Sequence, residues 1–325
     1  MNEHLLFDRF DGLIQENVSL KDKNWFQTGG CAWYFAAPST TEQFQATIGF
    51  AIQKSVPLFM LGQGANILVS DDGFAGLVIQ PKLNEIIQTT ENRADIAHIV
   101  AGAGVSMATL IDWCLERNFV GLEEFSGIPS SVGGAVYINL HYFEFLLQQF
   151  LVSAKLIHAK TAQLEVVGAE WFDFRYDYSK LHTKTHYLAS ATFAVKHVSK
   201  IEAAYAKGRS VEIIRHRAFK YPQNNTCGCF FRNFRESEVP FEINGKKMLS
   251  AAYYLDSVGV KGSLRVGGAV VSQKHANMIV NDGTATSQQI IELALQMQEI
   301  VKKRYGLLLQ PECQFLGIDK TIFGV

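Results

Sequence analysis

The sequence predicts an α+β protein built from more than one compact lobe. Its 325 residues are 48% hydrophobic and 19% charged, which suffices for two or three separate cores. Short runs of β-branched and aromatic residues recur along the chain, between a few segments of helical periodicity. Composition shifts at Tyr221-Pro222. We therefore expect two N-terminal lobes, residues 1–85 and 86–214, and a C-terminal domain, residues 215–325.

The first lobe is predicted to be rich in strands. Apolar runs at Leu58–Leu61, Ile67–Val69 and Leu77–Ile79 are separated by a glycine loop and an Asp-Asp-Gly turn. The glycine loop, residues 62–66, joins two strands, whereas a dinucleotide loop of the Rossmann type opens a helix and needs a third glycine. Taken alone, this loop is equally well interpreted as a tight hairpin.

The second lobe is predicted to alternate strands with helices. A strand at Ala97–Ala101 leads into a helix that Ser106 caps, with apolar residues on one face. Further strands are expected around Phe150–Ile157, Leu164–Val167 and Tyr187–Val195, followed by a polar helix over Lys200–Arg217.

The C-terminal domain is predicted to begin with a β region punctuated by glycines, which continues to about Val280. A long amphipathic helix is expected from about Thr286 to Tyr305, and a last strand before Gly317.

A second loop of small residues runs from Gly127 to Ala135. With little side-chain bulk, its backbone N–H groups could approach a pyrophosphate, and two such loops suit a dinucleotide. The alternative is a buried crossover that needs small residues only for packing.

Charge and cysteine content limit the partners. A formal net charge of −1 gives no support for nucleic-acid or membrane binding, so we expect a small-molecule ligand. The N-terminus lacks a secretory signal and no segment is apolar enough to span a bilayer, which favours the cytoplasm. An odd count of five cysteines fits reduced thiols, and Cys31, Cys114 and Cys313 are expected to be core residues.

Several motifs in the same order resemble the UDP-N-acetylenolpyruvoylglucosamine reductases, flavoenzymes of bacterial cell-wall synthesis. The motifs are Phe26-Gln27-Thr28-Gly29-Gly30, Leu61 to Val69, Gly127-Ile128-Pro129 through Ala135 with Asn139, Gly228-Cys229-Phe230-Phe231-Arg232-Asn233, Val260-Lys261-Gly262, Gly267 to Ser272, His275-Ala276-Asn277, Val280-Asn281 and Pro311-Glu312. The resemblance runs nearly end to end, and the short stretch between Arg175 and Cys229 indicates the shorter, second type of the family.

The resemblance implies noncovalent FAD, held by the first two lobes in the fold of vanillyl-alcohol-oxidase-type flavoproteins, with NADPH as the reductant. The C-terminal domain would bind the UDP-sugar substrate. The implied FAD-binding residues are Gly62, Gln63, Gly64, Ala65, Asn66, Ile67, Gly127, Ile128, Pro129, Ser131, Val132, Gly133 and Gly134.

The resemblance also implies three catalytic residues. Cys229 stands where the family usually has a serine that protonates the substrate carbon, and a thiol is the stronger acid of the two. Arg175 resembles the arginine that binds the enolpyruvyl carboxylate, although it could instead form a surface ion pair with Asp173 or Asp177. Glu312 matches a glutamate that helps to stabilise the enolate.

The substrate's diphosphate needs cationic and amide donors. The candidates are Arg217, Arg232, Asn233 and Lys261. His275 is expected to order a turn rather than to act as a base. A metal site at Cys227 and Cys229 is disfavoured by the one-residue spacing.

The chain departs from the family pattern at Gln63, Ala65, Ser130 and Leu140-His141. Two other functions therefore stay open: a flavoprotein of the same superfamily with a different substrate, and a relative that has lost flavin and acts as an interaction protein. A monomer is favoured, and the sequence leaves the oligomeric state open.

Overall fold

The computed structural model describes residues 12–89 and 95–324 and divides into two compact units. Among the described residues, unit 1 comprises 12–17, 33–63, 76–89 and 95–216, and unit 2 comprises 18–32, 64–75 and 217–324. The C-terminal part of unit 2 begins close to the predicted boundary at 215. The division also groups residues 18–32 and 64–75 with that part, whereas the sequence had assigned them to the first lobe.

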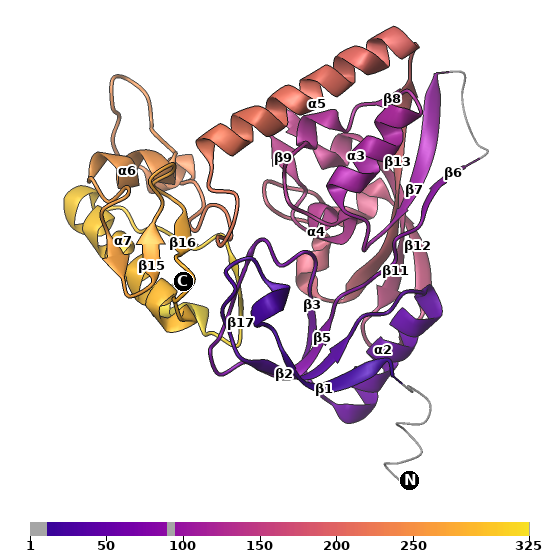
Figure 1. Ribbon diagram of the computed structural model, residues 1–325, viewed down its shortest axis with the longest axis horizontal. Helices are drawn as coiled ribbons and strands as arrows, with labels where there is room; N and C mark the ends of the chain where they lie inside the picture. The colour runs from indigo at the N-terminus through magenta and orange to yellow at the C-terminus, as the bar shows by residue number, and fades with distance from the viewer. Residues whose placement is uncertain (1–11, 90–94, 325) are drawn as a thin grey trace. The chain divides into compact units, whose positions relative to one another are not determined.

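The main sheet of unit 1 is antiparallel, and Figure 1 shows its strands side by side. Its order is β12-β11-β13-β7-β6, with β8 on β13. The strands are β6 (Ile86–Gln88), β7 (Ile96–Gly102), β8 (Phe119–Val120), β11 (Leu151–His158), β12 (Leu164–Gly168) and β13 (His186–His197). The four long strands that the sequence predicted here are confirmed.

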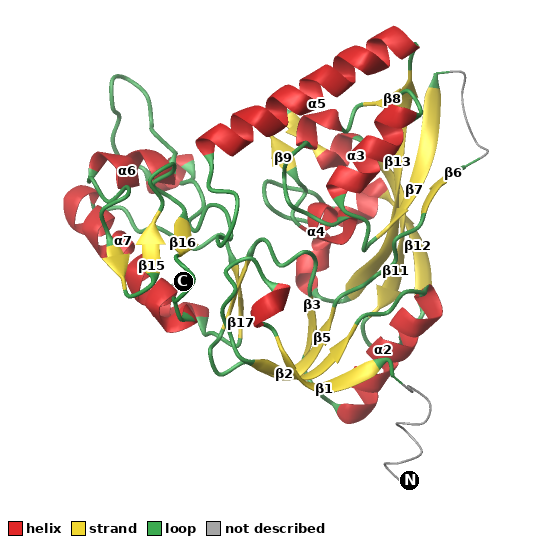
Figure 2. Cartoon of the chain, in the orientation of Figure 1, coloured by secondary structure: helices red, strands yellow, loops and turns green. Residues whose placement is uncertain are grey.

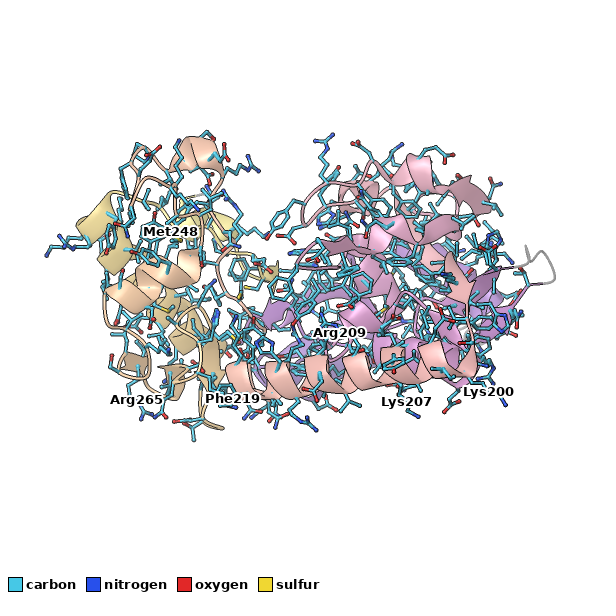
Figure 3. All side chains as sticks on the ribbon, turned by 90° about the horizontal axis from the view of Figure 1, so that it is seen from above. Lys200, Lys207, Arg209, Phe219, Met248 and Arg265 are labelled. Atoms are coloured by element: carbon cyan, nitrogen blue, oxygen red, sulfur yellow. The ribbon has the colours of Figure 1, made fainter. Side chains whose placement is uncertain are left out.

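Three helices belong to this region, α3 (Met107–Glu116), α4 (Val132–Tyr137) and α5 (Lys200–Lys220). The predicted cap is present, since the Ser106 hydroxyl accepts from the Thr109 N–H at 2.9 Å. The apolar face of α3 is buried in the same core as the inner residues of β7 and β13. Helix α5 exposes most of its length, and Figure 3 labels Lys200, Lys207 and Arg209 along it.

A second sheet has the order β1-β2-β5-β3. Its strands are β1 (Ile14–Ser19), β2 (Cys31–Ala36), β3 (Leu58–Met60) and β5 (Phe74–Ile79), and α2 (Thr41–Lys54) lies between β2 and β3 in sequence. Strand β3 pairs in parallel with β5, while β4 (Ile67–Val69) pairs in parallel with β17 (Gln314–Leu316). The strands on either side of loop 62–66 therefore do not pair with each other, and the hairpin interpretation is wrong.

The strands of unit 2 are short, and Figure 2 shows that loops connect them over much of this unit. Its three-stranded sheet is β14 (Arg265–Val266), β15 (Ala269–Val271) and β16 (Ile279–Asn281), with helices α6 (Ala251–Ser257) and α7 (Ser287–Tyr305). Helix α7 was predicted, and Thr286 caps it. The core contains Phe230, Phe231 and Tyr254, all fully buried.

The remaining elements are short. They are β9 (His141–Tyr142), β10 (Phe145–Leu146) and the 3₁₀ turns Lys21–Lys23, Glu123–Phe125, Leu147–Gln149, Ala169–Phe172, Lys180–Thr183, Glu236–Glu238 and Lys320–Phe323. Helices α2 and α6 and strands β1 and β2 were not predicted from the sequence, and the loop predicted over residues 127–135 is wrong in its second half, because α4 begins at Val132 with Ser131 as its cap. Within the described residues, no helix is long and apolar enough to cross a membrane.

Candidate active site

The segment of residues 227–233, here called the Cys229 segment, runs between two other extended segments of unit 2. On one side Cys229 forms an antiparallel bridge with Met278, and on the other Phe231 forms one with Pro311. The Phe230 carbonyl accepts from the Glu312 N–H at 2.8 Å. The structure thus brings Cys229 and Glu312, two of the three predicted catalytic residues, onto adjacent segments joined by isolated β-bridges and a backbone hydrogen bond.

Asn277 fixes this segment from within the core. Its Oδ1 accepts from the Phe231 N–H at 3.0 Å and its Nδ2 donates to the Phe231 carbonyl at 2.6 Å. Its own carbonyl accepts from the Phe230 N–H at 2.8 Å. Because Asn277 is 1% exposed, water cannot replace these bonds. Asn277 was part of a recognised motif but was absent from the predicted site, since its role depends on a partner 46 residues away.

The thiols of this segment differ in environment. Cys229 is half-buried, whereas Cys227 is buried in the core beside Cys313. Burial, followed by the hydrogen bond to Cys313, raises the pKa of the Cys227 thiol well above its usual value. Of the two, only Cys229 is accessible for proton transfer to a ligand. The prediction that Cys31 is a core residue is wrong, since it is half-buried, whereas Cys114 and Cys313 are buried as predicted.

Arg232, a predicted substrate ligand, is held by protein groups. Nη1 and Nη2 form a bidentate pair with Glu238 at 2.8 and 2.6 Å, and Nε donates to Gln310 Oε1 at 3.1 Å. Nη1 also donates to the Asn233 carbonyl, and Nη2 to Gln310. The hydrogen bond from Arg232 lowers the pKa of Glu238 to about 2. All five N–H donors are engaged, an arrangement that favours a structural role for Arg232.

The other predicted substrate residues of unit 2 keep more exposed polar groups. Asn233 is exposed and accepts from the Ala251 N–H at 3.2 Å through Oδ1. Lys261 Nζ lies 3.7 Å from Asp256 Oδ1, and the Arg217 guanidinium lies 5.1 Å from the centroid of the Tyr221 ring.

His275 is part of the same region, with its ring 5.3 Å from that of Tyr221. Burial, with smaller contributions from Lys220 and Lys261, lowers the pKa of His275 to about 4. Its backbone N–H donates to Ser272 Oγ at 3.4 Å, and its carbonyl accepts from the Met278 N–H. These bonds agree with the predicted role in ordering a turn.

Arg175 belongs to unit 1, in the turn of residues 173–178, here called the Arg175 turn. Its guanidinium pairs with Asp173 Oδ2 at 2.7 Å, and its side chain is 69% exposed. The ion pair that the sequence allowed as an alternative is therefore present. The carboxylate-binding role stays a prediction, because an exposed pair of this kind exchanges readily for another anion.

Two residues that the sequence reading did not assign to the site support the Arg175 turn. Asn139, 1% exposed, donates through Nδ2 to the Arg175 carbonyl at 3.1 Å and to Gln148 Oε1 at 2.7 Å. His141 Nδ1 lies 3.4 Å from Asp177 Oδ1. Asn139 was recognised only as part of a motif, and neither contact has a signal in a single sequence.

The two predicted flavin loops contact each other within unit 1. A Cβ added at Gly62 would lie 2.9 Å from Ser131 Oγ, so a larger residue there would require the Ser131 hydroxyl to move. In the second loop, the Val132 and Gly133 N–H groups donate to the Val105 and Ala103 carbonyls. The packing role that the sequence left open for this loop is therefore present. These two N–H groups already donate hydrogen bonds to protein carbonyls.

The rest of the first loop belongs to unit 2. Gly64 has φ +70°, and a Cβ there would overlap the Lys23 carbonyl. The buried Oδ1 of Asn66 has no hydrogen-bond partner among the described residues, although the Asn66 carbonyl accepts from the Gln314 N–H at 3.0 Å. A buried acceptor without a donor indicates a place for a ligand group, and FAD fits this requirement.

Comparison with known proteins agrees with this arrangement. Residues 33–166 match the FAD binding domain family, and residues 220–316 match the C-terminal domain of UDP-N-acetylenolpyruvoylglucosamine reductase. The enzyme of that name from Acaryochloris marina is 33% identical over 94% of this chain and 93% of its own. The chain belongs to the UDP-N-acetylenolpyruvoylglucosamine reductase family. The family member from Protochlamydia amoebophila is likewise 33% identical, over 94% of each chain.

A solved structure of the family has the same fold. UDP-N-acetylenolpyruvylglucosamine reductase from Thermus caldophilus superposes with a TM-score of 0.72 at 28% identity, covering 92% of this chain and 97% of that one. The predicted α+β class, with an FAD-binding region followed by a substrate domain of the reductase family, is confirmed. The individual site residues stay predictions.

Proposed function

We propose that this protein reduces the enolpyruvyl group of UDP-N-acetylenolpyruvoylglucosamine to give UDP-N-acetylmuramate, with FAD as cofactor and NADPH as reductant. The observation that carries the proposal is the position of Cys229. In a chain of this family, its half-buried thiol lies on a segment that is hydrogen-bonded to the segment of Glu312. The protein would act in peptidoglycan precursor synthesis, in the cytoplasm and as a monomer.

The chemistry divides between cofactor and protein. Bound FAD supplies hydride transfer, while the chain must orient the alkene, stabilise negative charge and deliver one proton. The Cys229 Sγ–H donates that proton to the substrate carbon next to the one that receives hydride. Because Asn277 holds the backbone of residues 230 and 231, the thiol is presented from a fixed strand.

Charge on the substrate is assigned to two other groups. Arg175 exchanges its ion pair with Asp173 for the planar enolpyruvyl carboxylate. Glu312 polarises the developing enolate, through its own proton or a bound water. Arg217, Lys261 and Asn233 contact the diphosphate end. Arg232 positions Asn233 through its bond to the Asn233 carbonyl.

The residues of loops 62–67 and 127–134 are assigned to FAD. Asn66 Oδ1 accepts from a cofactor group, and Gly62 lets the two loops approach each other closely at Ser131. Gln63 and Ser130 are the departures from the family pattern within these loops.

The test combines spectroscopy with turnover. Purified protein incubated with FAD should retain a flavin absorption spectrum after desalting, and NADPH oxidation should depend on UDP-N-acetylenolpyruvoylglucosamine. A protein that stays colourless after incubation would contradict both flavoprotein functions. The remaining hypothesis would then be a relative that has lost flavin and acts as an interaction protein. If the protein retains flavin but its rate of NADPH oxidation does not depend on this substrate, the protein is a flavoprotein with another substrate.

A further inference from the structure

The hairpin of β9 and β10 contacts the Arg175 turn, and the proposed function gives it no role. Its register pairs His141 with Leu146. Just before it, Leu140 is 3% exposed. The Leu140 N–H donates to the Ala135 carbonyl and the Leu140 carbonyl accepts from the Leu147 N–H, both at 2.8 Å. The backbone that carries His141 is therefore fixed to the core of unit 1.

The Arg175 turn contains two residues in a disfavoured backbone conformation. Asp173 has φ +43° and Asp177 has φ +52°, and each lies two positions from Arg175. The left-handed region is unfavourable for residues with a side chain, although Asp tolerates it better than most. Such residues keep their conformation where contacts around them hold it. The backbone that carries the guanidinium therefore depends on its surroundings.

The two aspartates have partners of different kinds. Asp173 pairs with Arg175 itself, and both side chains are more than half exposed, so this pair attaches the turn to nothing outside it. Asp177 Oδ1 lies 3.4 Å from His141 Nδ1, and these side chains are only 24% and 28% exposed. Because partial burial reduces screening by water and salt, the contact with His141 is the stronger anchor.

His141 also contacts the residue between Arg175 and Asp177. Its ring centroid lies 4.7 Å from that of Tyr176, with an interplanar angle of 44°. One imidazole thus touches the two residues that directly follow Arg175. Since Asn139 bonds to the Arg175 carbonyl, three consecutive residues of the turn are attached to the segment of residues 139–141.

We propose that His141 is a positioning residue for Arg175. Through Asp177 and Tyr176 it fixes the backbone of the turn, so that the guanidinium meets a planar carboxylate in the orientation that two parallel hydrogen bonds require. Binding groups of this kind must be held to within about 0.5 Å. His141 is a position at which the chain departs from the family pattern, so this contact belongs to this chain. The attachment of the turn rests on the contacts above, and its consequence for substrate binding rests on the proposed function.

Hydrogen–deuterium exchange of the FAD-loaded protein without substrate tests the attachment. His141→Phe keeps an aromatic ring beside Tyr176 and removes the polar contact with Asp177. The Arg175 and Tyr178 N–H groups donate to each other's carbonyls, so their exchange reports on the turn. Exchange in peptides that cover residues 173–178 should become faster by more than about threefold in His141→Phe.

His197→Phe is the matched control. His197 belongs to the same unit, and its ring packs 5.4 Å from that of Phe119 at the C-terminal end of β13. This variant should change neither the exchange of the turn nor the KM for the substrate. Unchanged exchange in His141→Phe, or equally faster exchange in both variants, would overturn the proposal.

Steady-state kinetics test the consequence for the substrate. His141→Phe should raise the KM for UDP-N-acetylenolpyruvoylglucosamine by about 3- to 10-fold and keep kcat within about twofold, because proton delivery is assigned to Cys229. Asp177→Asn should have the same effect, since Asn tolerates the left-handed backbone and only the charge is lost. The double variant should have a KM close to that of the single variants, because both changes remove one contact. Single effects that multiply in the double variant would contradict the pairing.

The two readouts distinguish this proposal from the proposed function. Faster exchange of the turn with an unchanged KM would confirm that His141 fixes the turn and would contradict the role of Arg175 in the proposed function. A raised KM with unchanged exchange would overturn the positioning role, because His141 would then act on the substrate directly.

Discussion

The Cys229 segment and the Arg175 turn carry the two central groups of the proposed reaction, and they are built differently. The first is a segment between two others in the core of unit 2, with backbone hydrogen bonds to the buried Asn277 amide. The second is a surface turn closed by mutual bonds between Arg175 and Tyr178 backbone groups, with the guanidinium held by an exposed carboxylate.

The difference indicates how each group would work. A proton donor must be held within hydrogen-bond reach of one carbon, which a core strand can do. A carboxylate-binding arginine must release one anion and accept another, which an exposed side chain on a supported turn can do. Asn139 supplies the support, since it anchors the Arg175 carbonyl while the guanidinium side chain stays 69% exposed.

The largest effect is expected from removing the thiol of the Cys229 segment. Cys229→Ala should retain FAD and its reduction by NADPH but lose about two to four orders of magnitude in product formation, the usual contribution of a positioned acid. Stopped-flow absorbance separates flavin reduction from product formation. Turnover close to wild type would mean that water or another group donates the proton.

The next effect concerns the anchoring of the same segment. Asn277→Ala removes both side-chain bonds to Phe231 and should lower the free energy of unfolding by about 2 to 4 kcal/mol, because buried backbone groups are left unpaired. Urea denaturation measures the change.

Asn277→Asp is the matched variant, because it keeps an acceptor for the Phe231 N–H and removes the donor to the carbonyl. We expect the Asp variant to lose a comparable amount, since it brings a carboxylate into the core. A loss below about 0.5 kcal/mol in both variants would contradict the view that Asn277 fixes the strand.

A pH effect on stability should arise in the buried region around the Cys229 segment, at His275. The pKa of His275 is lowered from 6.5 to about 4 in the folded protein, so the unfolded chain binds the additional proton between these values. Stability from this group is complete above about pH 6.5 and should fall by about 1 to 3 kcal/mol as the pH drops to 4.

Urea denaturation at several pH values tests this expectation. His275→Gln should remove that part of the pH dependence, and the exposed His216→Gln is the control. An unchanged pH profile in His275→Gln would show that other groups cause the dependence.

The smallest effect is expected at the Arg175 turn. Asp173→Asn removes an ion pair whose side chains are 69% and 57% exposed, and should change the free energy of unfolding by less than about 0.5 kcal/mol. It should lower the KM for the substrate, because Arg175 no longer has a competing carboxylate. A destabilisation above about 1.5 kcal/mol would mean that the pair, rather than Asn139, holds the turn.

Local signals predicted much of the fold. The strands of the main sheet of unit 1, the Ser106 cap and α7 follow from alternation, periodicity and capping, which depend on residues close in sequence. Helices α2 and α6 were missed. The pairing of β4 with β17 could not be predicted, because it joins residues almost 250 positions apart. As a result, loop 62–66 connects strands of two different sheets instead of forming the expected hairpin.

The candidate site was predicted less evenly. Cys229, Glu312 and the glycine loops were predicted because they lie in recognisable motifs, and the structure places the segments of Cys229 and Glu312 side by side. Arg232 was expected to contact substrate, but its donors face Glu238 and Gln310. Side-chain hydrogen bonds between distant residues carry no signature in a single sequence.

The sequence by itself determined the family, the α+β class and the presence of a cysteine where a serine is usual, because these depend on residue identity and local order. Only the tertiary structure decided that Cys229 bridges Met278, that Asn277 holds the adjoining Phe231, and that Cys227 is buried against Cys313. Burial and strand register arise when distant segments pack together, and they determine which of several identical thiols can meet a ligand.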